Sequence, residues 1–413
     1  MRWRVEGEAT IMNRRERVLA ALNHQEPDRV PIDLGGSDST GITAIAYNRL
    51  KSYLGIEGGR TRIFDPYQQI VDVEERVLEA VKSDVRSVMV HPKNWKPWKL
   101  SDGSDSEIPG KWNPQYREDG SQVVLDEQGE IVSIMPSQGL YFEPVIAPLK
   151  DCQSIDDFDR HKEDIVSFDL PPYLDQSFGE MAKTAGEIRK RSDYLLSGGN
   201  FAAHVFASCQ SLRGWDVFLL DLLERPLFAE ALMDRLVEAY CERFDRYWSS
   251  LGQYLDVVVV SDDLGTQKAP ILSPDLYRRR IKPYHKRLYS YIKEKSDAFI
   301  FMHSCGSIYR LIPDLIEAGI DILNPVQVNA AEMDTRRLKK EFGDVLVFWG
   351  GGCDTQRILP NGTRQEVRDE VKRRVDDLAP GGGFVFTQVH NILPDVSPEN
   401  MMAMYEAVWE FGG

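Results

Sequence analysis

The sequence predicts an α/β fold in which eight parallel strands close into a TIM (β/α)8 barrel. Short runs rich in β-branched and aromatic residues recur along the chain, and they are almost continuous in hydrophobicity, as strands buried on both faces must be. Amphipathic helical stretches separate the runs at intervals of about 20 to 40 residues, which is the rhythm of βαβ units in a parallel sheet. There are eight such runs, and eight parallel strands close a TIM barrel.

Eight runs are strand candidates. In chain order they are residues 29–34, 85–90, 194–199, 255–263, 298–305, 321–327, 345–351 and 383–390. Eight is the number of strands that closes a TIM barrel. A doubly wound open sheet is the alternative, but such a sheet usually has a Gly-rich phosphate loop after its first strand. Here the first run leads into "GGSDSTG" (35–41), which lacks that spacing, so the barrel is favoured.

The clearest helix is expected between the last two strands. Thr363 and Glu366 have the spacing of a capping box. The helix then presents one apolar stripe and ends at "PGGG" (380–383); the stripe consists of Val367, Val371, Val375 and Leu378.

Residues from about 92 to 190 interrupt this rhythm. The stretch "SQVVLDEQGEIVSIM" (121–135) alternates in polarity around a turn at 127–129, which predicts a β-hairpin. Three tryptophans lie close by, and they either form a wall of the substrate site or simply pack the insertion: Trp95, Trp98 and Trp112. We therefore expect residues 1–413 to form one barrel domain, with an inserted lobe over one end.

The charge balance limits the partners. A formal net charge of −15 argues against a nucleic-acid partner, because phosphates need a basic surface. The densest basic stretch, residues 277–287, has the spacing of a solvated helix face. No apolar run approaches the roughly 18 residues that a membrane span needs, so no membrane partner is expected.

The cysteines and the first residues predict a cytoplasmic protein. The five cysteines are odd in number and widely spaced, which indicates free thiols in a reducing compartment rather than a disulfide framework. Residues 1–17 are charged and have no apolar core, so no signal peptide is expected.

In a TIM barrel the active site lies at the carboxyl ends of the strands, so the polar residues at these ends are the candidates. They are Asn200, His204, Asp262, Asp263, His303, Cys305, Asn324, Cys353 and His390. His204 is equally well explained as a core residue. The remaining histidines are expected to be structural: His24, His91, His161 and His285.

His303 and Cys305 are two positions apart, so along a strand both side chains point to the same side. Imidazole nitrogen and thiolate sulfur are zinc ligands, and a catalytic zinc site has three protein ligands and one open position. His390, at the end of the last strand, is the natural third ligand, and Cys353 competes with it. The alternative is structural: a buried cysteine commonly packs as a small apolar residue, and a histidine at a strand end is commonly only hydrogen-bonded.

Asp262 and Asp263 follow four consecutive valines. A carboxylate at the mouth of an apolar barrel can act as a general acid or base, accept a hydrogen bond from the substrate, or orient a metal-bound histidine. The alternative is helix capping, and one of the two aspartates is expected to do only that.

Three longer stretches are distinctive as whole segments. They are "MNRRERVLAALNHQEPDRVPI" (12–32), "MHSCGSIYRLIPDLIEAGIDILNPVQ" (302–327) and "ILPDVSPENMMAMYEAV" (392–408). Together they resemble the uroporphyrinogen decarboxylase superfamily, whose members share a TIM barrel. The resemblance covers most of the chain from residue 12 onward, apart from the insertion, and is strongest in the C-terminal part.

The superfamily that the chain resembles has two chemically distinct branches. Its decarboxylases use no metal, and arginines near the N-terminus hold the carboxylates of a tetrapyrrole. The matching region here, "IDLGGSDSTG" (32–41), has no arginine. A polycarboxylate without cationic partners is poorly held, which argues against that activity.

The other branch contains zinc-dependent methyltransferases that act with a corrinoid protein. Their His-x-Cys-Gly signature is matched by "HSCG" (303–306). Their third ligand is usually a cysteine, and His390 stands at that place in "QVHNILP" (388–394). The resemblance thus implies zinc at His303, Cys305 and His390, the last of which departs from the family pattern.

The resemblance also implies roles for the other polar residues. It places Asp262 at a strand-end position of the family, so we expect Asp262 to face the pocket as the catalytic acid or base. Asp263 is then expected to cap the next helix, and it is also a candidate for substrate binding. Asn200 and Asn324 are expected to contact the substrate.

The predicted function is that of an enzyme, a methyltransferase that moves a methyl group between a small substrate, such as a methoxylated aromatic or a thiol, and the cobalt of a corrinoid protein. The expected cofactors are zinc and the partner's corrinoid, and a homo-oligomer is a further expectation. The first alternative is a metal-free decarboxylase that uses Asp262 and His390. The second is a non-catalytic barrel that binds a corrinoid or a tetrapyrrole.

Overall fold

A parallel β-sheet forms the centre of the molecule. The structure, a computed structural model, describes residues 11–126, 128–168, 170–171, 173–199 and 203–413. Seven strands lie in the order β15 (Phe384–Val385), β14 (Val347–Trp349), β13 (Ile322–Asn324), β12 (Phe299–His303), β11 (Val257–Ser261), β10 (Leu195–Gly198) and β3 (Val85–Val88). Every neighbouring pair is parallel, and all seven strands fall within predicted runs.

The eighth predicted strand closes the sheet into a ring. Ile32 forms a parallel bridge to Phe386, just beyond β15. On its other side, the Ile32 carbonyl accepts a hydrogen bond of 2.7 Å from the N–H of Asp84, which directly precedes β3. The Asp84 carboxylate is fully buried, accepts the Ile32 N–H, and pairs with Arg17 and Arg29. The predicted TIM-type barrel is confirmed, with its first strand reduced to a short closing segment.

Successive side chains of each strand point alternately into the barrel and toward the helices. The inward residues form one buried cluster, which contains Val85, Leu195, Val257, Phe301, Ile322, Val347, Trp349 and Val385. Their neighbours in sequence, such as Val258, Ile300 and Leu323, belong to the larger cluster beneath the helices. Because the period is two, the direction of a residue at a strand end follows from counting back along its strand.

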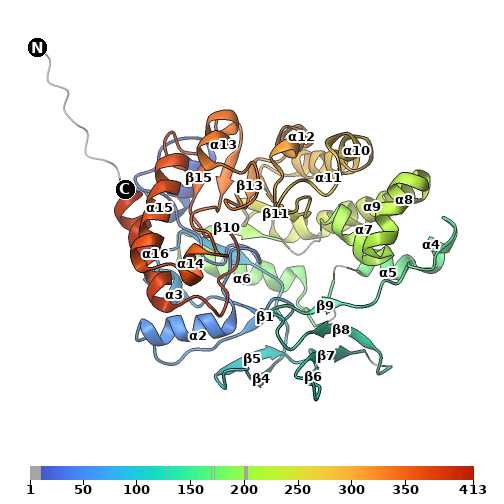
Figure 1. Cartoon of the computed structure of the whole chain (residues 1–413), viewed down its shortest axis with the longest axis horizontal. Helices are drawn as coiled ribbons and strands as arrows, with labels where there is room; N and C mark the ends of the chain where they lie inside the picture. Colours follow the sequence, from blue (N-terminus) through green and yellow to red (C-terminus); the bar gives the residue numbers. More distant parts are fainter. Residues whose placement is uncertain (1–10, 127, 169, 172, 200–202) are drawn as a thin grey trace, which may run out of the picture.

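A layer of helices surrounds the sheet (Figure 1). Its main members are α2 (Ala44–Tyr53), α6 (Phe178–Arg191), α9 (Pro226–Leu251), α11 (Lys282–Lys295), α12 (Ile312–Ala318), α13 (Thr335–Phe342), α15 (Arg364–Leu378) and α16 (Pro398–Phe411). Further helices are α3 (Glu75–Ala80), α7 (Val205–Arg213), α8 (Trp215–Glu224), α10 (Pro274–Arg280) and α14 (Ile358–Asn361). Helix α15 begins at the predicted capping box of Thr363 and Glu366. Within the described residues, no helix combines the length and apolar composition of a membrane span.

Helix α1 (Arg14–Leu22) covers the amino end of the barrel. Val18, Ala21 and Leu22 belong to the same buried cluster as the inward residues of the strands. A capping box between Asn13 and Glu16 begins the helix. Because α1 fills this end, the carboxyl ends of the strands form the mouth that remains open to ligands, as in other TIM barrels.

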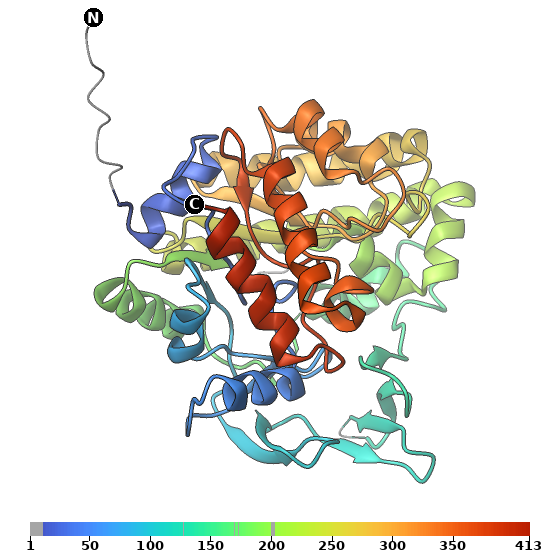
Figure 2. The same cartoon turned by 60° about the vertical axis from the view of Figure 1, so that its left-hand side comes forward.

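An inserted lobe follows β3, and its β-strands lie at the lower edge of both views (Figure 1 and Figure 2). It contains β4 (Trp95–Lys99), β5 (Asp105–Pro109), β6 (Pro114–Tyr116), β7 (Gln122–Leu125), β8 (Ile131–Met135) and β9 (Glu143–Pro144), followed by α4 (Asp157–Arg160) and α5 (Lys162–Ser167). Strands β7 and β8 pair antiparallel, as the predicted hairpin requires. The nearby strands β1 (Ile63–Asp65) and β2 (Ile70–Val71) form a separate pair.

The lobe ends earlier than the sequence suggested. Helix α6 falls within the predicted insertion of residues 92–190, yet it contacts β3 and α9 and leads directly into β10. It is therefore the crossover helix of the barrel's β3–α6–β10 unit. The sequence did not reveal this helix, because α6 lies between β3 and β10 together with the β7–β8 hairpin, whose alternating pattern was the stronger signal.

The tryptophans of the lobe pack within it. Trp112 is 4% exposed and meets Phe142 edge-on, with ring centroids 5.3 Å apart. Trp98 stacks on Tyr116. The sequence left open whether these tryptophans line the substrate site or pack the insertion, and both contacts lie within the insertion.

Asp262 does not face the barrel mouth, and in this the prediction was wrong. Val257 points inward, so by alternation Asp262 points outward. Its carboxylate is fully buried, accepts the N–H groups of Phe206 and Ala207 at 2.9 and 2.7 Å, and lies 2.7 Å from Nε2 of His285. Asp262 therefore joins the sheet to the first turn of α7 and to α11, a structural role that we had assigned to Asp263.

Replacement of Asp262 by alanine is expected to lower the free energy of unfolding by roughly 3–5 kcal/mol, because the buried His285 and two backbone N–H groups lose their acceptor. Urea unfolding followed by circular dichroism measures this loss. Asp263→Ala is the matched control and should cost less than about 1 kcal/mol, since 55% of the Asp263 side chain is exposed. Equal losses from the two variants would contradict the assignment.

Candidate metal centre

Three candidate ligands meet at the barrel mouth. His303 is the last residue of β12, Cys305 follows it by two positions, and His390 lies in the segment after β15. One ligand atom from each residue lies within 4.8 Å of the other two. Cys305 Sγ is 3.4 Å from His303 Nε2, and the centroids of the two imidazole rings are 5.6 Å apart. The sequence predicted this set, and the structure brings its members together.

Asn324 fixes the orientation of His303. Its Oδ1 lies 2.6 Å from Nδ1 of His303, and its Nδ2 donates to the Trp349 carbonyl at 2.8 Å. The second bond determines which end of the amide faces the imidazole, so His303 donates its Nδ1 proton to Asn324. The other nitrogen, Nε2, is thereby directed to Cys305 and His390, as in metal sites where an outer residue sets the tautomer.

Asn324 was predicted to bind substrate, and the structure gives it a different position. It points inward on β13 beside His303, its register partner on β12, its side chain is fully buried, and Ser39 Oγ lies 3.1 Å from its Oδ1. Because the Asn324 amide is enclosed in this way, it orients His303 and does not itself reach the mouth. Alternation of β13, with Ile322 inward, explains the placement.

The turn after β12 places Cys305. Its N–H donates to Oδ1 of Asp263 at 2.8 Å, and the next N–H, of Gly306, donates to Oε1 of Gln327 at 2.7 Å. Gly306 has φ +92°, and a Cβ there would lie 2.4 Å from the backbone of Gly265. Only glycine allows this backbone conformation and this close approach.

Asp263, expected to cap a helix, lies at the mouth instead. Its Oδ1 is 3.8 Å from His303 Nε2 as well as bonded to the Cys305 N–H. The carboxylate is therefore placed next to two of the three candidate ligands. Asn200, the remaining predicted substrate contact, lies outside the described residues.

The segment that carries His390 is tied to the loop after the closing strand. Asn391 Oδ1 accepts the Gly41 N–H at 2.7 Å, and Gln388 Nε2 donates to the carbonyl of Thr40 at 3.2 Å. Both side chains are buried. His390 is thus held between two anchored neighbours, on the far side of the mouth from β12.

The two imidazoles differ in their electrostatics. Burial lowers the pKa of His303, but the negative charge of Cys305, its hydrogen bond and Asp263 outweigh burial and raise the pKa to about 10. Burial and then the charge of His303 lower the pKa of His390 to about 4, so this ring is neutral at physiological pH. A neutral imidazole offers its lone pair, and His303 and Cys305 would hold a metal ion in place of the proton that they share.

Cys353, the competing third ligand, is not part of the cluster. Its side chain is fully buried, and burial raises the pKa of its thiol well above the ordinary value. Among the described residues, the group of three or more potential metal ligands that converge consists of His303, Cys305 and His390. One thiolate and two imidazoles suit zinc and not a hard cation such as magnesium, which prefers oxygen ligands. The residues present therefore fit a zinc ion.

A pocket of about 380 Å³ opens beside the cluster. It is lined by Tyr141, Gly265, Thr266, Gln267, Cys305, Gly306, Gln327, Thr355, Gln356, Val389, His390, Asn391 and Leu393. These described residues include no lysine, arginine, aspartate or glutamate. Tyr141 comes from the inserted lobe, and none of the three tryptophans of the lobe is among them.

Sequence reasoning missed two residues of this site. Gln327 supports the turn after Cys305, and Tyr141 forms one wall of the pocket. Alternation along β13 identifies Asn324 as an inward residue, but Gln327 lies beyond the strand, where no period applies. Tyr141 lies in a loop of the insertion, and the aromatic composition of that region was the one signal for it.

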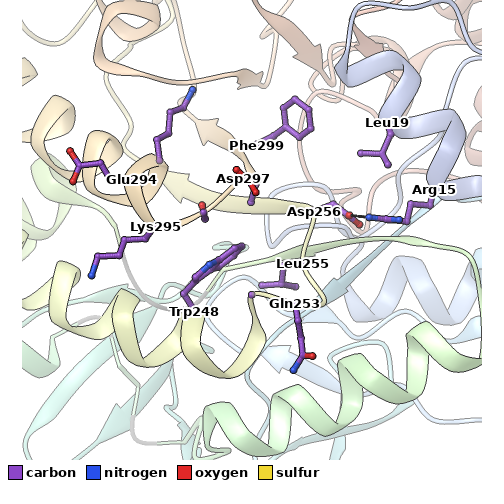
Figure 3. Close-up of a pocket in the computed structure, with 14 residues that line it drawn as sticks. Arg15, Leu19, Trp248, Gln253, Leu255, Asp256, Glu294, Lys295, Asp297 and Phe299 are labelled. Atoms are coloured by element: carbon purple, nitrogen blue, oxygen red, sulfur yellow. Dashed lines mark hydrogen bonds and ion pairs between the residues drawn. The ribbon is translucent and has the colours of Figure 1, made fainter.

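A larger hollow, of about 680 Å³, lies at the opposite end of the barrel (Figure 3). It includes Asp256, which directly precedes β11, and Phe299, the first residue of β12. Arg15 and Asp256 form an ion pair of 2.7 Å in it, and its two lysines, Lys293 and Lys295, pair with aspartates outside it. These charges are paired within the protein, and the hollow lies at the end of a TIM barrel that serves stability.

Comparison with known proteins agrees with this architecture. Curated proteins named uroporphyrinogen decarboxylase from Chlorobium phaeobacteroides and Chlorobium limicola are 28% and 22% identical to the chain, each over 70% of this chain and 77% of the relative. A solved structure of a methyltransferase from Methanosarcina mazei superposes with a TM-score of 0.57 at 16% identity, over 97% of this chain and 99% of the other.

The family profile gives the assignment. The profile described as Uroporphyrinogen decarboxylase (URO-D) matches residues 148–411, which is more than half of the chain and includes His303, Cys305 and His390. It begins after Tyr141 and the lobe's β-strands. From this match, and from the barrel with its mouth at the strand ends, it follows that the chain belongs to the uroporphyrinogen decarboxylase family of enzymes.

Proposed function

We propose that this protein is a zinc-dependent methyltransferase that moves a methyl group between a small substrate and the cobalt of a separate corrinoid protein. The observation that carries the proposal is the cluster of His303, Cys305 and His390, whose ligand atoms lie within 4.8 Å of one another at the barrel mouth. Three protein ligands leave one position of a tetrahedral zinc ion for the substrate, as in catalytic rather than structural sites.

Zinc in this site would act as a Lewis acid, lowering the pKa of a thiol or polarising an ether oxygen of the substrate. The protein contributes the placement. Asn324 holds His303 in the tautomer that offers Nε2, and Asp263 holds the Cys305 backbone. The pocket beside the cluster receives the small substrate. The open mouth leaves room for a larger partner to approach from the same side.

The lining of the pocket favours this proposal over decarboxylation. A tetrapyrrole with several carboxylates needs cationic partners, and the described residues that line the pocket include no lysine or arginine. The decarboxylase alternative also relied on Asp262, which is buried behind the sheet and bonded to α7. The name of the Methanosarcina mazei structure, a methyltransferase, adds support by analogy.

Turnover separates the proposal from its alternatives. The zinc-loaded protein is incubated with a reduced corrinoid protein and a panel of methyl ethers and methyl thioethers, and methylation of cobalt is followed by its visible absorbance. Methyl transfer that needs both zinc and the corrinoid protein is the expected result. Decarboxylation of uroporphyrinogen without metal would favour the first alternative, and corrinoid binding without turnover would favour the non-catalytic barrel.

Replacement of Cys305 by alanine is expected to abolish stoichiometric zinc while leaving the barrel folded, because the cluster lies at the open mouth and the core does not depend on it. Elemental analysis of protein purified without added metal measures this. Cys353→Ala is the matched control: it removes a buried thiol from the segment after β14 and should keep one zinc per chain. His390→Ala should weaken zinc binding. Zinc loss in Cys353→Ala but not in His390→Ala would reassign the third ligand.

Replacement of Asn324 by alanine is expected to weaken zinc binding by roughly 10- to 100-fold, because His303 loses the group that fixes its orientation. Competition with a chromophoric zinc chelator measures the affinity. The control is Asn329→Ala, since Asn329 bonds Asp354 and Gln356 outside the cluster and should leave zinc affinity unchanged. An unchanged zinc affinity in Asn324→Ala would show that the bond to His303 has no part in holding the metal.

A further inference from the structure

The charge of the pocket limits what it can bind. Its described lining includes no lysine, arginine, aspartate or glutamate. The two positive charges of a bound zinc ion would be offset by the Cys305 thiolate and by Asp263, which lies 3.8 Å from His303. A carboxylate in the substrate would lose its hydration without gaining a lysine or arginine partner.

Tyr141 is the aromatic wall of this pocket, and the lobe holds it in place from both sides. It lies in the loop between β8 and β9. The carbonyl of the preceding residue, Leu140, accepts a hydrogen bond of 3.3 Å from Gln69 Nε2. The following residue, Phe142, donates its N–H to the Tyr67 carbonyl at 2.9 Å and buries its ring in the lobe. Tyr141 is therefore fixed by its neighbours rather than carried on a free loop.

The Tyr141 hydroxyl is available to a ligand. It has no hydrogen-bond partner among the described residues. Burial, and then the negative charges of Cys305 and Asp395, raise the pKa of Tyr141. The hydroxyl therefore stays protonated and can donate a hydrogen bond. A fixed phenol with an unused donor beside the metal cluster offers both a flat apolar face and one directional polar contact.

We propose that Tyr141 is a specificity residue of this enzyme and that the site selects an uncharged substrate, whose ring packs on Tyr141 and one of whose oxygens accepts a hydrogen bond from the Tyr141 hydroxyl. The inference rests on the proposed function for the location of the reacting centre. It goes beyond the family assignment, because Tyr141 precedes the region that the family profile matches. The inserted lobe thereby becomes a functional part of the site.

Binding tests this proposal without turnover. Guaiacol and vanillate are the probes, because both are aromatic methyl ethers of similar shape and vanillate adds a carboxylate. Each is titrated by calorimetry into the zinc-loaded protein near neutral pH, where guaiacol is uncharged. Guaiacol is expected to bind at least about tenfold more tightly than vanillate. Equal affinities, or no guaiacol binding, would overturn the proposal.

Variants of Tyr141 complete the test. Tyr141→Phe is expected to weaken guaiacol binding by about 3- to 10-fold through loss of one hydrogen bond, and Tyr141→Ala to weaken it further through loss of the ring. Tyr116→Ala is the matched control, because Tyr116 is a half-exposed tyrosine of the same lobe stacked on Trp98, away from the pocket. Zinc content should be unchanged in all three variants. Unchanged guaiacol affinity in Tyr141→Phe and Tyr141→Ala would overturn the role of Tyr141.

The outcome is separable from that of the proposed function. Methyl transfer to cobalt with equal affinities for guaiacol and vanillate would leave the methyltransferase proposal standing and overturn the specificity inference. Tyr141-dependent guaiacol binding without any methyl transfer would support the inference and count against the methyltransferase.

Discussion

Closure of the sheet around Ile32 is the constraint on which the rest of the structure depends. In the sheet order β15 is three strands away from β12, which is about 14 Å in a flat sheet. The ring brings the segment after β15 across the mouth, so that His390 meets His303. A chain of contacts also leads from the closing strand to the site: Trp349 donates its indole N–H to the buried Asp33, and the Trp349 carbonyl holds Asn324. Barrel and cluster are thus parts of one arrangement.

The fold was predictable because each strand had to be apolar on both faces. All eight runs were found in this way, and the residue types at their ends identified His303, Cys305 and His390. The error at Asp262 has a physical cause. The alternation that places His303 and Cys305 together also turns Asp262 toward the helices, once Val257 is known to point inward. Which two of the four valines point inward is decided by the register with β12, and a single strand does not encode it.

Other parts of the site were beyond the reach of periodicity. The lobe and the barrel share the long interval between β3 and β10, so the crossover helix α6 was hidden beside a stronger hairpin signal. Tyr141 reaches the pocket because its neighbours are bonded to Gln69 and Tyr67, residues far away in the sequence. Loops are positioned by such tertiary contacts, whereas helices and strands are indicated by local patterns.

The short closing strand also bears on how the chain folds as it is synthesised. It meets β3 early, but its other neighbours, Phe386 and the carbonyl of Gly412, belong to the last part of the described chain. At about 5–20 residues per second, a ribosome needs roughly 20–70 s to make the intervening segment. During that time the edge of the closing strand that pairs with Phe386 has no partner, and α1 lacks its contacts with β15. Such long-range pairing is slow to form and leaves surface exposed to aggregation until the C-terminal part has been made.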